Sequence, residues 1–123
     1  MTKNEIILAN QECLFPSVFH YFKEPLVLVR AKDQYVWDAD GNQYLDFFGG
    51  ILTVSVGHCN DRVNKALHAQ IDTLQHVSTL FVTEPQAALA RKISDIAPAP
   101  GWKSFFTSSG TEANETAILA ARC

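Results

Sequence analysis

The chain has 123 residues, of which 47% are hydrophobic, and its formal net charge is −3. This apolar content is enough to build a core and too high for a disordered tail. Lysines and arginines are scattered without a basic run, which argues against nucleic acid as a partner. No apolar run approaches the roughly 20 residues that a membrane span requires, and no signal-peptide pattern opens the chain.

Cysteines and histidines set further limits on the class of protein. Cys13, Cys59 and Cys123 show no CxxC spacing, which favours a reducing compartment, so we expect a cytoplasmic location. His68 and His76 are eight residues apart, too far along a helix to share a metal ion, and no metal site is expected.

The first half of the chain predicts a small sheet. We expect residues 1–20 to be irregular and strands at 26–29, 34–37 and 44–47. The Asp-Gly-Asn sequence at 40–42 is a turn signal between the second and third strands. Three strands in this order form an antiparallel meander, which is too small to be stable without another packing partner.

Two helices follow the meander. Gly49 and Gly50 end the third strand, residues 51–56 are expected to be extended, and Asn60 is expected to cap a helix. The buried stripe of that helix is predicted to be Val63, Leu67, Ile71 and Leu74. The next helix is predicted to begin with a capping box between Thr83 and Gln86, with Pro85 tolerated near its start, and to end before Pro98.

The last third of the chain predicts one strand at 102–107 and a helix that begins at about Thr111. The order of strands and helices is typical of the opening of an α/β protein whose sheet is unfinished. We therefore expect that the chain is truncated, or that partners supply the remaining elements.

The turn before this last helix is the strongest functional signal. Ser108, Ser109 and Thr111 place three hydroxyl groups around Gly110, which would let a ligand oxygen approach the backbone closely. The turn follows an apolar strand and opens a helix, the position at which α/β proteins bind anions.

An alternative is a well-capped helix without a ligand. Ser109 and Glu112 have capping-box spacing. Glu112 and Glu115 would also repel a phosphate unless Glu112 folds back into the cap. The turn lacks the Walker lysine and the G-x-G-x-x-G pattern, which leaves a mononucleotide phosphate or a phosphorylated cofactor.

These motifs resemble a known family. Ser-Ser-Gly-Thr-Glu-Ala-Asn-Glu at 108–115 resembles the S-G-[TSA]-E-A segment of class III aminotransferases, which are fold-type-I enzymes that use pyridoxal 5′-phosphate (PLP). Residues 36–46 are similar to the meander of that family, and residues 47–59 most resemble its alanine–glyoxylate aminotransferase 2-like branch. The resemblance extends over 15–122.

The resemblance implies a fold and several roles. Residues 1–57 would be an N-terminal segment with the meander, and residues 58–123 the beginning of the large PLP-binding α/β domain. Gly110 and Thr111 would bind the cofactor phosphate with support from Ser109, and Ile51 would line the substrate pocket. His58 is interpreted as structural.

Five aromatic residues are interpreted as core rather than as ligand-binding groups: Trp37, Tyr44, Phe47, Phe105 and Phe106.

The resemblance also implies what this chain lacks. In the family, the lysine that bonds to the cofactor lies far downstream, and no lysine of this chain stands in a matching context, so no catalytic residue is assigned here. The parent would be a homodimer that transfers an amino group between an amine or amino acid and a keto acid, and the chain alone would be inactive.

Two alternatives to an aminotransferase remain open at this stage. One is a self-standing binding or oligomerisation module that kept the scaffold without the chemistry. The other is a fold-type-I relative with different chemistry, such as a racemase, mutase or decarboxylase.

Overall fold

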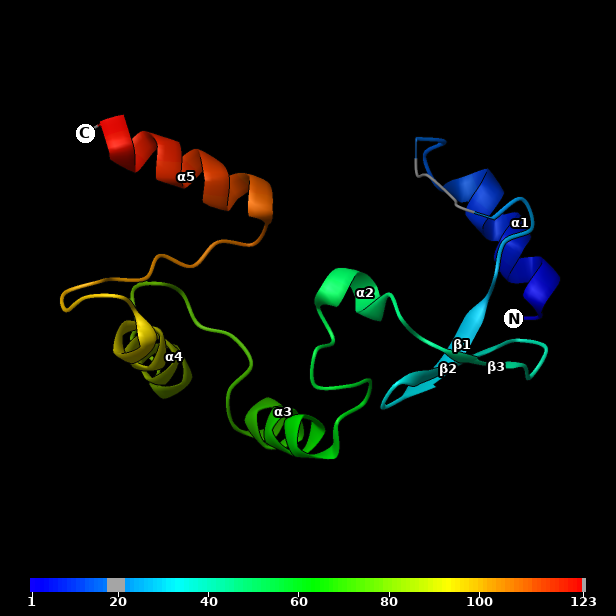
Figure 1. Cartoon of the computed structure of the whole chain (residues 1–123), viewed down its shortest axis with the longest axis horizontal. Coiled ribbons are helices and arrows are strands. Elements are labelled where there is room, and N and C mark those ends of the chain that lie inside the picture. Colours follow the sequence, from blue (N-terminus) through cyan, green and yellow to red (C-terminus); the bar gives the residue numbers. More distant parts are fainter. Residues whose placement is uncertain (18–21, 123) are drawn as a thin grey trace. The chain divides into compact units, whose positions relative to one another are not determined.

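The computed structural model describes residues 1–17 and 22–122 (Figure 1). It divides into two compact units, Met1–Gln75 and His76–Cys123, which are described separately below. The assignment of 1–57 and 58–123 to parts of a larger enzyme stays a prediction. The elements in chain order are α1 (Lys3–Cys13), β1 (Leu28–Lys32), β2 (Tyr35–Asp38), β3 (Gln43–Leu45), α2 (Gly49–Leu52), α3 (Asp61–Thr73), α4 (Glu84–Ile96) and α5 (Gly110–Arg122).

The meander in the first unit is confirmed. Its three strands pair antiparallel in the order β1-β2-β3, and Tyr35 of β2 lies opposite Lys32 on one side and Leu45 on the other. The first strand begins two residues later than predicted and continues to Lys32. Asp33, at φ 50°, turns the chain between β1 and β2. Val36, in the middle strand, is the buried hydrophobic residue of the described part of the chain.

The prediction that residues 1–20 are irregular is wrong for Lys3–Cys13, which form α1, and residues 18–21 lie outside the described residues. A reciprocal capping box starts this helix. The Glu5 N–H donates to Thr2 Oγ1 at 3.3 Å, and the Thr2 N–H donates to Glu5 Oε2 at 2.8 Å. The Thr-x-x-Glu spacing is the sequence signal that indicates this start.

Residues 51–56 are not extended, as the sequence analysis expected, but form tight turns. The four residues of α2, Gly49 to Leu52, all have φ between 55° and 64°, so this short element is a left-handed turn rather than an ordinary α-helix. The Val54 N–H donates to the Gly49 carbonyl at 3.1 Å, which closes this left-handed turn. The two glycines therefore begin a reversal of the chain direction rather than only ending a strand.

Both predicted helices in the middle of the chain are present, but only one has the predicted cap. Asn60 Oδ1 accepts hydrogen bonds from the N–H groups of Arg62 and Val63 at the start of α3. Thr83 precedes α4 without a side-chain capping bond, so the predicted capping box is wrong. Pro85, the second residue of α4, has no N–H to donate to a cap, and the remaining candidate, the N–H of Gln86, makes no hydrogen bond to the Thr83 side chain.

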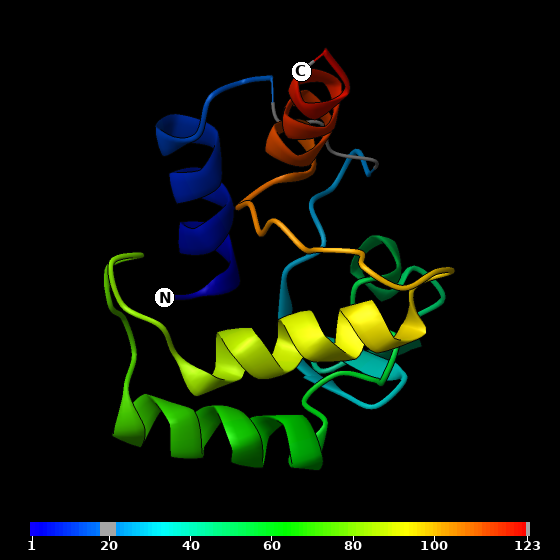
Figure 2. The same cartoon turned by 90° about the vertical axis from the view of Figure 1, so that its left-hand side faces the viewer.

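The predicted strand at 102–107 is also wrong for the described residues. This segment joins α4 to α5 in extended form (Figure 2), and no other described segment pairs with it. An extended segment becomes a strand only when a neighbour supplies the ladder of hydrogen bonds.

The aromatic residues predicted as core are buried unevenly. Phe47 and Phe105 are 89% and 78% exposed, which contradicts the prediction for both, and Phe106 and Tyr44 are also exposed. Trp37 is half-buried, and the Arg30 guanidinium lies 3.7 Å from the centre of its ring. Among the residues that the structure describes, no helix has both the length and the apolar character needed to cross a bilayer.

We expect the replacement Asn60→Ala to lower the free energy of unfolding by about 1 kcal/mol, because the N–H groups of Arg62 and Val63 lose their acceptor. Urea unfolding followed by circular dichroism measures this change. Lys65→Ala, at an exposed position in the same helix, serves as the control. Equal stability of the Asn60→Ala variant and the wild type would contradict the role of this cap.

Candidate functional site

The hydroxyl-rich turn opens α5 as a capped helix. The Ala113 N–H donates to the Ser109 carbonyl at 3.1 Å, which makes Ser109 the N-cap residue. The Glu112 N–H donates to Ser109 Oγ at 3.2 Å. In return, Glu112 Oε2 accepts a hydrogen bond from the Ser108 N–H at 2.8 Å. The capping-box spacing therefore forms contacts, with the glutamate one residue further back than in the usual box.

This cap leaves a set of free donors. Within the described part of the chain, the backbone N–H groups of Ser109, Gly110 and Thr111 have no hydrogen-bond acceptor. They lie at the positive end of a 13-residue helix, which carries roughly half an elementary charge. The Glu112 carboxylate is folded back onto Ser108. The sequence analysis expected Glu112 to repel a phosphate unless it folded back into the cap, and the structure shows this folded-back position.

Gly110 leaves room for such an anion. A Cβ built on this residue would have no heavy atom within 4 Å, beyond its chain neighbours and its own helix. Free N–H donors, a helix dipole and an open approach at Gly110 fit the phosphate group of PLP. The three residues predicted to bind the cofactor, Ser109, Gly110 and Thr111, thus lie together at the start of α5.

Ile51, predicted to line the substrate pocket, belongs to the first unit. It lies in the left-handed turn at φ 59°, followed by Leu52 at φ 64°, and the two residues are 73% and 79% exposed. This conformation costs L-residues roughly 1–2 kcal/mol each, so contacts elsewhere must hold the turn. His58, interpreted as structural, does make such a contact, because its Nε2 lies 2.6 Å from Asp46 Oδ2.

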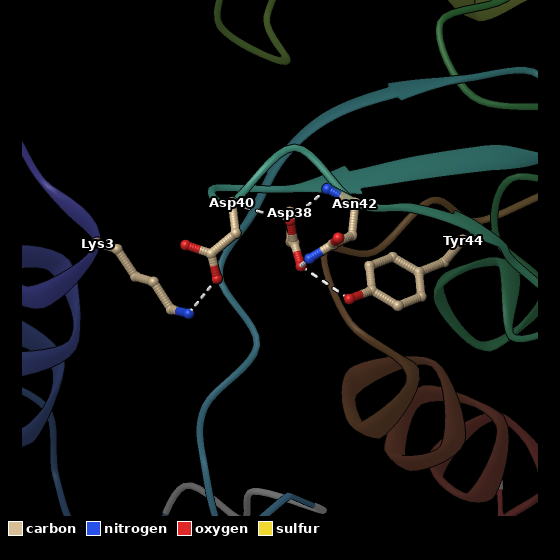
Figure 3. Close-up of polar contacts among 5 residues, drawn as sticks. All are labelled: Lys3, Asp38, Asp40, Asn42 and Tyr44. Carbon is tan, nitrogen blue, oxygen red and sulfur yellow. Dashed lines mark hydrogen bonds and ion pairs between the residues drawn. The ribbon is translucent and has the colours of Figure 1, made fainter.

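Sequence analysis missed a carboxylate network at the end of β2 (Figure 3). Asp38 is 4% exposed. Its Oδ1 accepts from the N–H groups of Asp40 and Asn42, and its Oδ2 accepts from the Asn42 amide and the Tyr44 hydroxyl at 2.9 and 2.7 Å. Lys3 of α1 forms an ion pair with Asp40. The Asp-x-Asp-Gly-Asn sequence signals a turn but does not show that Asp38 accepts four hydrogen bonds.

The network changes the acidity of its members. The side-chain hydrogen bond from Asn42, with those from Tyr44 and the backbone, lowers the pKa of Asp38 to about 2. The hydrogen bond to the Asp38 carboxylate raises the pKa of Tyr44. In the neighbouring turn, the hydrogen bond from His58 and the N–H groups of Gly49 and Phe48 lower the pKa of Asp46. Both carboxylates are therefore structural acceptors that stay ionised at neutral pH.

The three-stranded sheet, the helices and the capped, glycine-containing turn before α5 define a small α/β protein. Residues 20–123 match the family described as aminotransferase class-III, and the chain belongs to this family. Class-III aminotransferases are PLP-dependent enzymes, so the comparison confirms the family and the cofactor that the motifs indicate.

Two curated relatives illustrate the similarity. Mitochondrial alanine–glyoxylate aminotransferase 2 from Pongo abelii is 44% identical over 119 residues, which are 97% of this chain and 23% of the relative. Acetylornithine aminotransferase from Caldanaerobacter subterraneus subsp. tengcongensis is 46% identical over 102 residues, which are 83% of this chain and 25% of the relative. The chain therefore spans about a quarter of the length of these relatives.

Solved structures share the fold. An (S)-enantioselective omega-transaminase from Thermomicrobium roseum is similar with a TM-score of 0.86 at 35% identity, over 99% of this chain and 29% of that chain. The omega transaminase from Pseudomonas jessenii in complex with PMP gives a TM-score of 0.78 at 33% identity, over 92% of this chain and 26% of that chain. These neighbours confirm the predicted α/β fold of PLP-dependent transaminases.

The low pKa of Asp38 predicts acid sensitivity. Since about 2 lies below the ordinary value of about 3.9, the stabilising contribution is fully present above pH 4 and is lost as the pH falls towards 2. Carboxyl-carbon NMR should show a titration midpoint near 2 for Asp38. Tyr44→Phe should raise this midpoint, and Asn42→Ala should raise it further, because the hydrogen bond from the Asn42 side-chain amide lowers the pKa of Asp38 more than the one from the Tyr44 hydroxyl does. An ordinary midpoint in the wild type would contradict the network.

Proposed function

We propose that this chain supplies the phosphate-binding turn and part of the substrate-side wall of a PLP-dependent aminotransferase. The reaction would transfer an amino group between an amine or amino acid and a keto acid. The observation that supports this proposal is the set of three free N–H groups at the start of α5, in a chain of the class-III family. PLP, when bound, supplies the electron sink that such a transfer requires.

The residues of the turn have separate tasks in this proposal. Gly110 and Thr111 donate their backbone N–H groups to phosphate oxygens, and the Thr111 hydroxyl is available as a further donor. Ser109 supports them, because its Oγ accepts from the Glu112 N–H and fixes the first turn of α5. Glu112 in turn holds Ser108, because its carboxylate accepts a hydrogen bond from the Ser108 N–H.

Ile51 is proposed to contact the substrate. Its side chain is apolar and 73% exposed, and the left-handed turn presents it outside the hydrogen-bonded part of the meander. An exposed isoleucine held in an unfavourable backbone conformation is typical of a residue that is placed for contact rather than for burial.

The wider setting is also proposed. The chain would be the N-terminal part of a cytoplasmic homodimeric enzyme, inactive alone because the cofactor-bonding lysine is not among its residues. Reading the coding sequence beyond Cys123 tests this proposal. A continuation in frame to an aspartate and then a lysine in the context of the family would support it, and an immediate stop codon would favour the non-catalytic module.

The replacement Gly110→Val should weaken PLP binding to the complete enzyme more than tenfold, because the added side chain fills the space of a phosphate oxygen. Among the described residues, a Cβ at position 110 would have no heavy atom within 4 Å apart from its chain neighbours and its own helix. Equilibrium dialysis of the apo-enzyme measures the dissociation constant.

Two comparisons complete this test. Gly110→Ala should give a smaller loss than Gly110→Val, and Ala121→Val, near the far end of α5, should leave the dissociation constant within about twofold of the wild type. Unchanged affinity in Gly110→Val would place the phosphate elsewhere and contradict the proposed cradle.

The chain by itself should form no specific covalent bond to PLP. Incubation with PLP, borohydride reduction and peptide mass spectrometry should find at most scattered modification of exposed lysines. The physical reason is that selective attachment requires a lysine held beside the bound cofactor. Stoichiometric modification of a single lysine would contradict this prediction.

A further inference from the structure

A side-chain pair closes the base of the segment that carries Ile51. His58 Nε2 lies 2.6 Å from Asp46 Oδ2, and the two side chains are 21% and 14% exposed. We name residues 47–57, which lie between them, the Gly49 loop. The pair thus joins the two ends of this loop from a mostly buried position.

The backbone at both ends of the loop is held on the turn between β1 and β2. The Asp46 N–H donates to the Gln34 carbonyl at 2.9 Å. His58 and Asp33 exchange two backbone hydrogen bonds, at 2.8 and 2.9 Å. A Cβ on Gly57 would lie 3.1 Å from Asp33 Cα, so the glycine allows the two backbones to approach. The base of the loop is therefore fixed to the sheet.

The interior of the loop depends on the same aspartate. Asp46 Oδ1 accepts from the N–H groups of Phe48 and Gly49, at 2.8 and 2.9 Å, at the start of the left-handed turn. Ile51 and Leu52 adopt that turn with 73% and 79% of their surface exposed. Because these side chains bury little, their packing does not hold the turn. The polar contacts of Asp46 orient its first residues, together with hydrogen bonds within the loop from the Val54 N–H to the Gly49 carbonyl and from Thr53 Oγ1 to the Gly50 carbonyl.

We propose that Asp46 and His58 are positioning residues that set the conformation of the Gly49 loop and, through it, the place of Ile51. His58 acts by occupying Oδ2 of Asp46, which aims Oδ1 at Phe48 and Gly49. The effect of this pair on substrate binding rests on the proposed role of Ile51. Its effect on the conformation of the Gly49 loop is independent of that role.

NMR of the full 123-residue chain tests the conformational part. His58→Leu should change the three-bond HN–Hα couplings of residues 48–55, because the aspartate loses its partner. His58→Gln retains a side-chain N–H donor and should restore couplings close to those of the wild type. His68→Leu, at an exposed position on α3, should leave the couplings unchanged.

Couplings in His58→Leu identical to those of the wild type would overturn the inference. If this variant fails to fold, Asp46→Asn decides, since it keeps the volume and one oxygen for Phe48 and Gly49 while it removes the charge that faces His58. Changed couplings in Asp46→Asn would then support the pair, and unchanged couplings would overturn it.

Kinetics of the complete enzyme test the connection to substrate. His58→Leu should raise KM for the amino donor at least fivefold, with kcat and PLP affinity within twofold of the wild type, and His58→Gln should rescue KM. Ile51→Ala should raise KM by a similar factor, and combining it with His58→Leu should add little. Parallel losses of kcat and PLP affinity would indicate general destabilisation and overturn the positioning role.

The two levels can fail separately. A wild-type enzyme without transaminase activity would contradict the proposed function and remove the link to substrate. The couplings measured on the chain would still show whether Asp46 and His58 set the loop.

Discussion

The described structure depends on one constraint, which is that backbone N–H groups at turns and helix starts need an acceptor. Side-chain oxygens supply it at the main changes of chain direction. Asp38 accepts from the turn between β2 and β3, Asp46 accepts at the start of the Gly49 loop, and Asn60 caps α3. Since few apolar side chains are buried, these polar contacts fix the local conformations to an unusual extent.

The same constraint explains why the start of α5 differs from the starts of the two preceding helices. The first residue of α3 is Asp61 and that of α4 is Glu84, so each of these helices begins with an acidic residue, whose charge is favourable near the positive end of the helix dipole. The first residue of α5 is Gly110, which has no side chain, and the nearest acid, Glu112, is turned back onto Ser108. Among these three helices, α5 is therefore the one whose first residue puts no side chain in front of the N–H groups.

Local sequence signals predicted much of this arrangement. The meander, the cap at Asn60 and the start of α5 depend on residues within a few positions of one another, so a single sequence is enough to indicate them. The hydrogen bond that folds Glu112 back onto Ser108 is also local, and the sequence analysis named this contact as a condition for an anion at the turn. The family and the cofactor followed from three motifs in a consistent order.

Other features escaped prediction because they depend on contacts that spacing does not determine. The left-handed turn at Ile51 requires Asp46 to accept from Phe48 and Gly49, and an apolar stretch gives no sign of that contact. The low pKa of Asp38 requires Asn42 and Tyr44 to meet on one carboxylate. The predicted strand at 102–107 needed a neighbouring strand, and its residues alone cannot supply one.

That segment bears directly on how the phosphate turn would act. Residues 102–107 lead into Ser108, and Phe105 within them is 78% exposed. The amphipathic faces of α3 and α4 are exposed as well, with Leu67 at 55% and Leu89 at 49%. Apolar surface of this kind calls for a covering partner, either further chain or another subunit.

Pairing of 102–107 with such a partner would fix the backbone before Ser109. Three donors on a fixed backbone lose less entropy on binding a phosphate than three donors on a free segment. The affinity of the proposed phosphate turn would therefore depend on the order of the segment before it as well as on the turn itself.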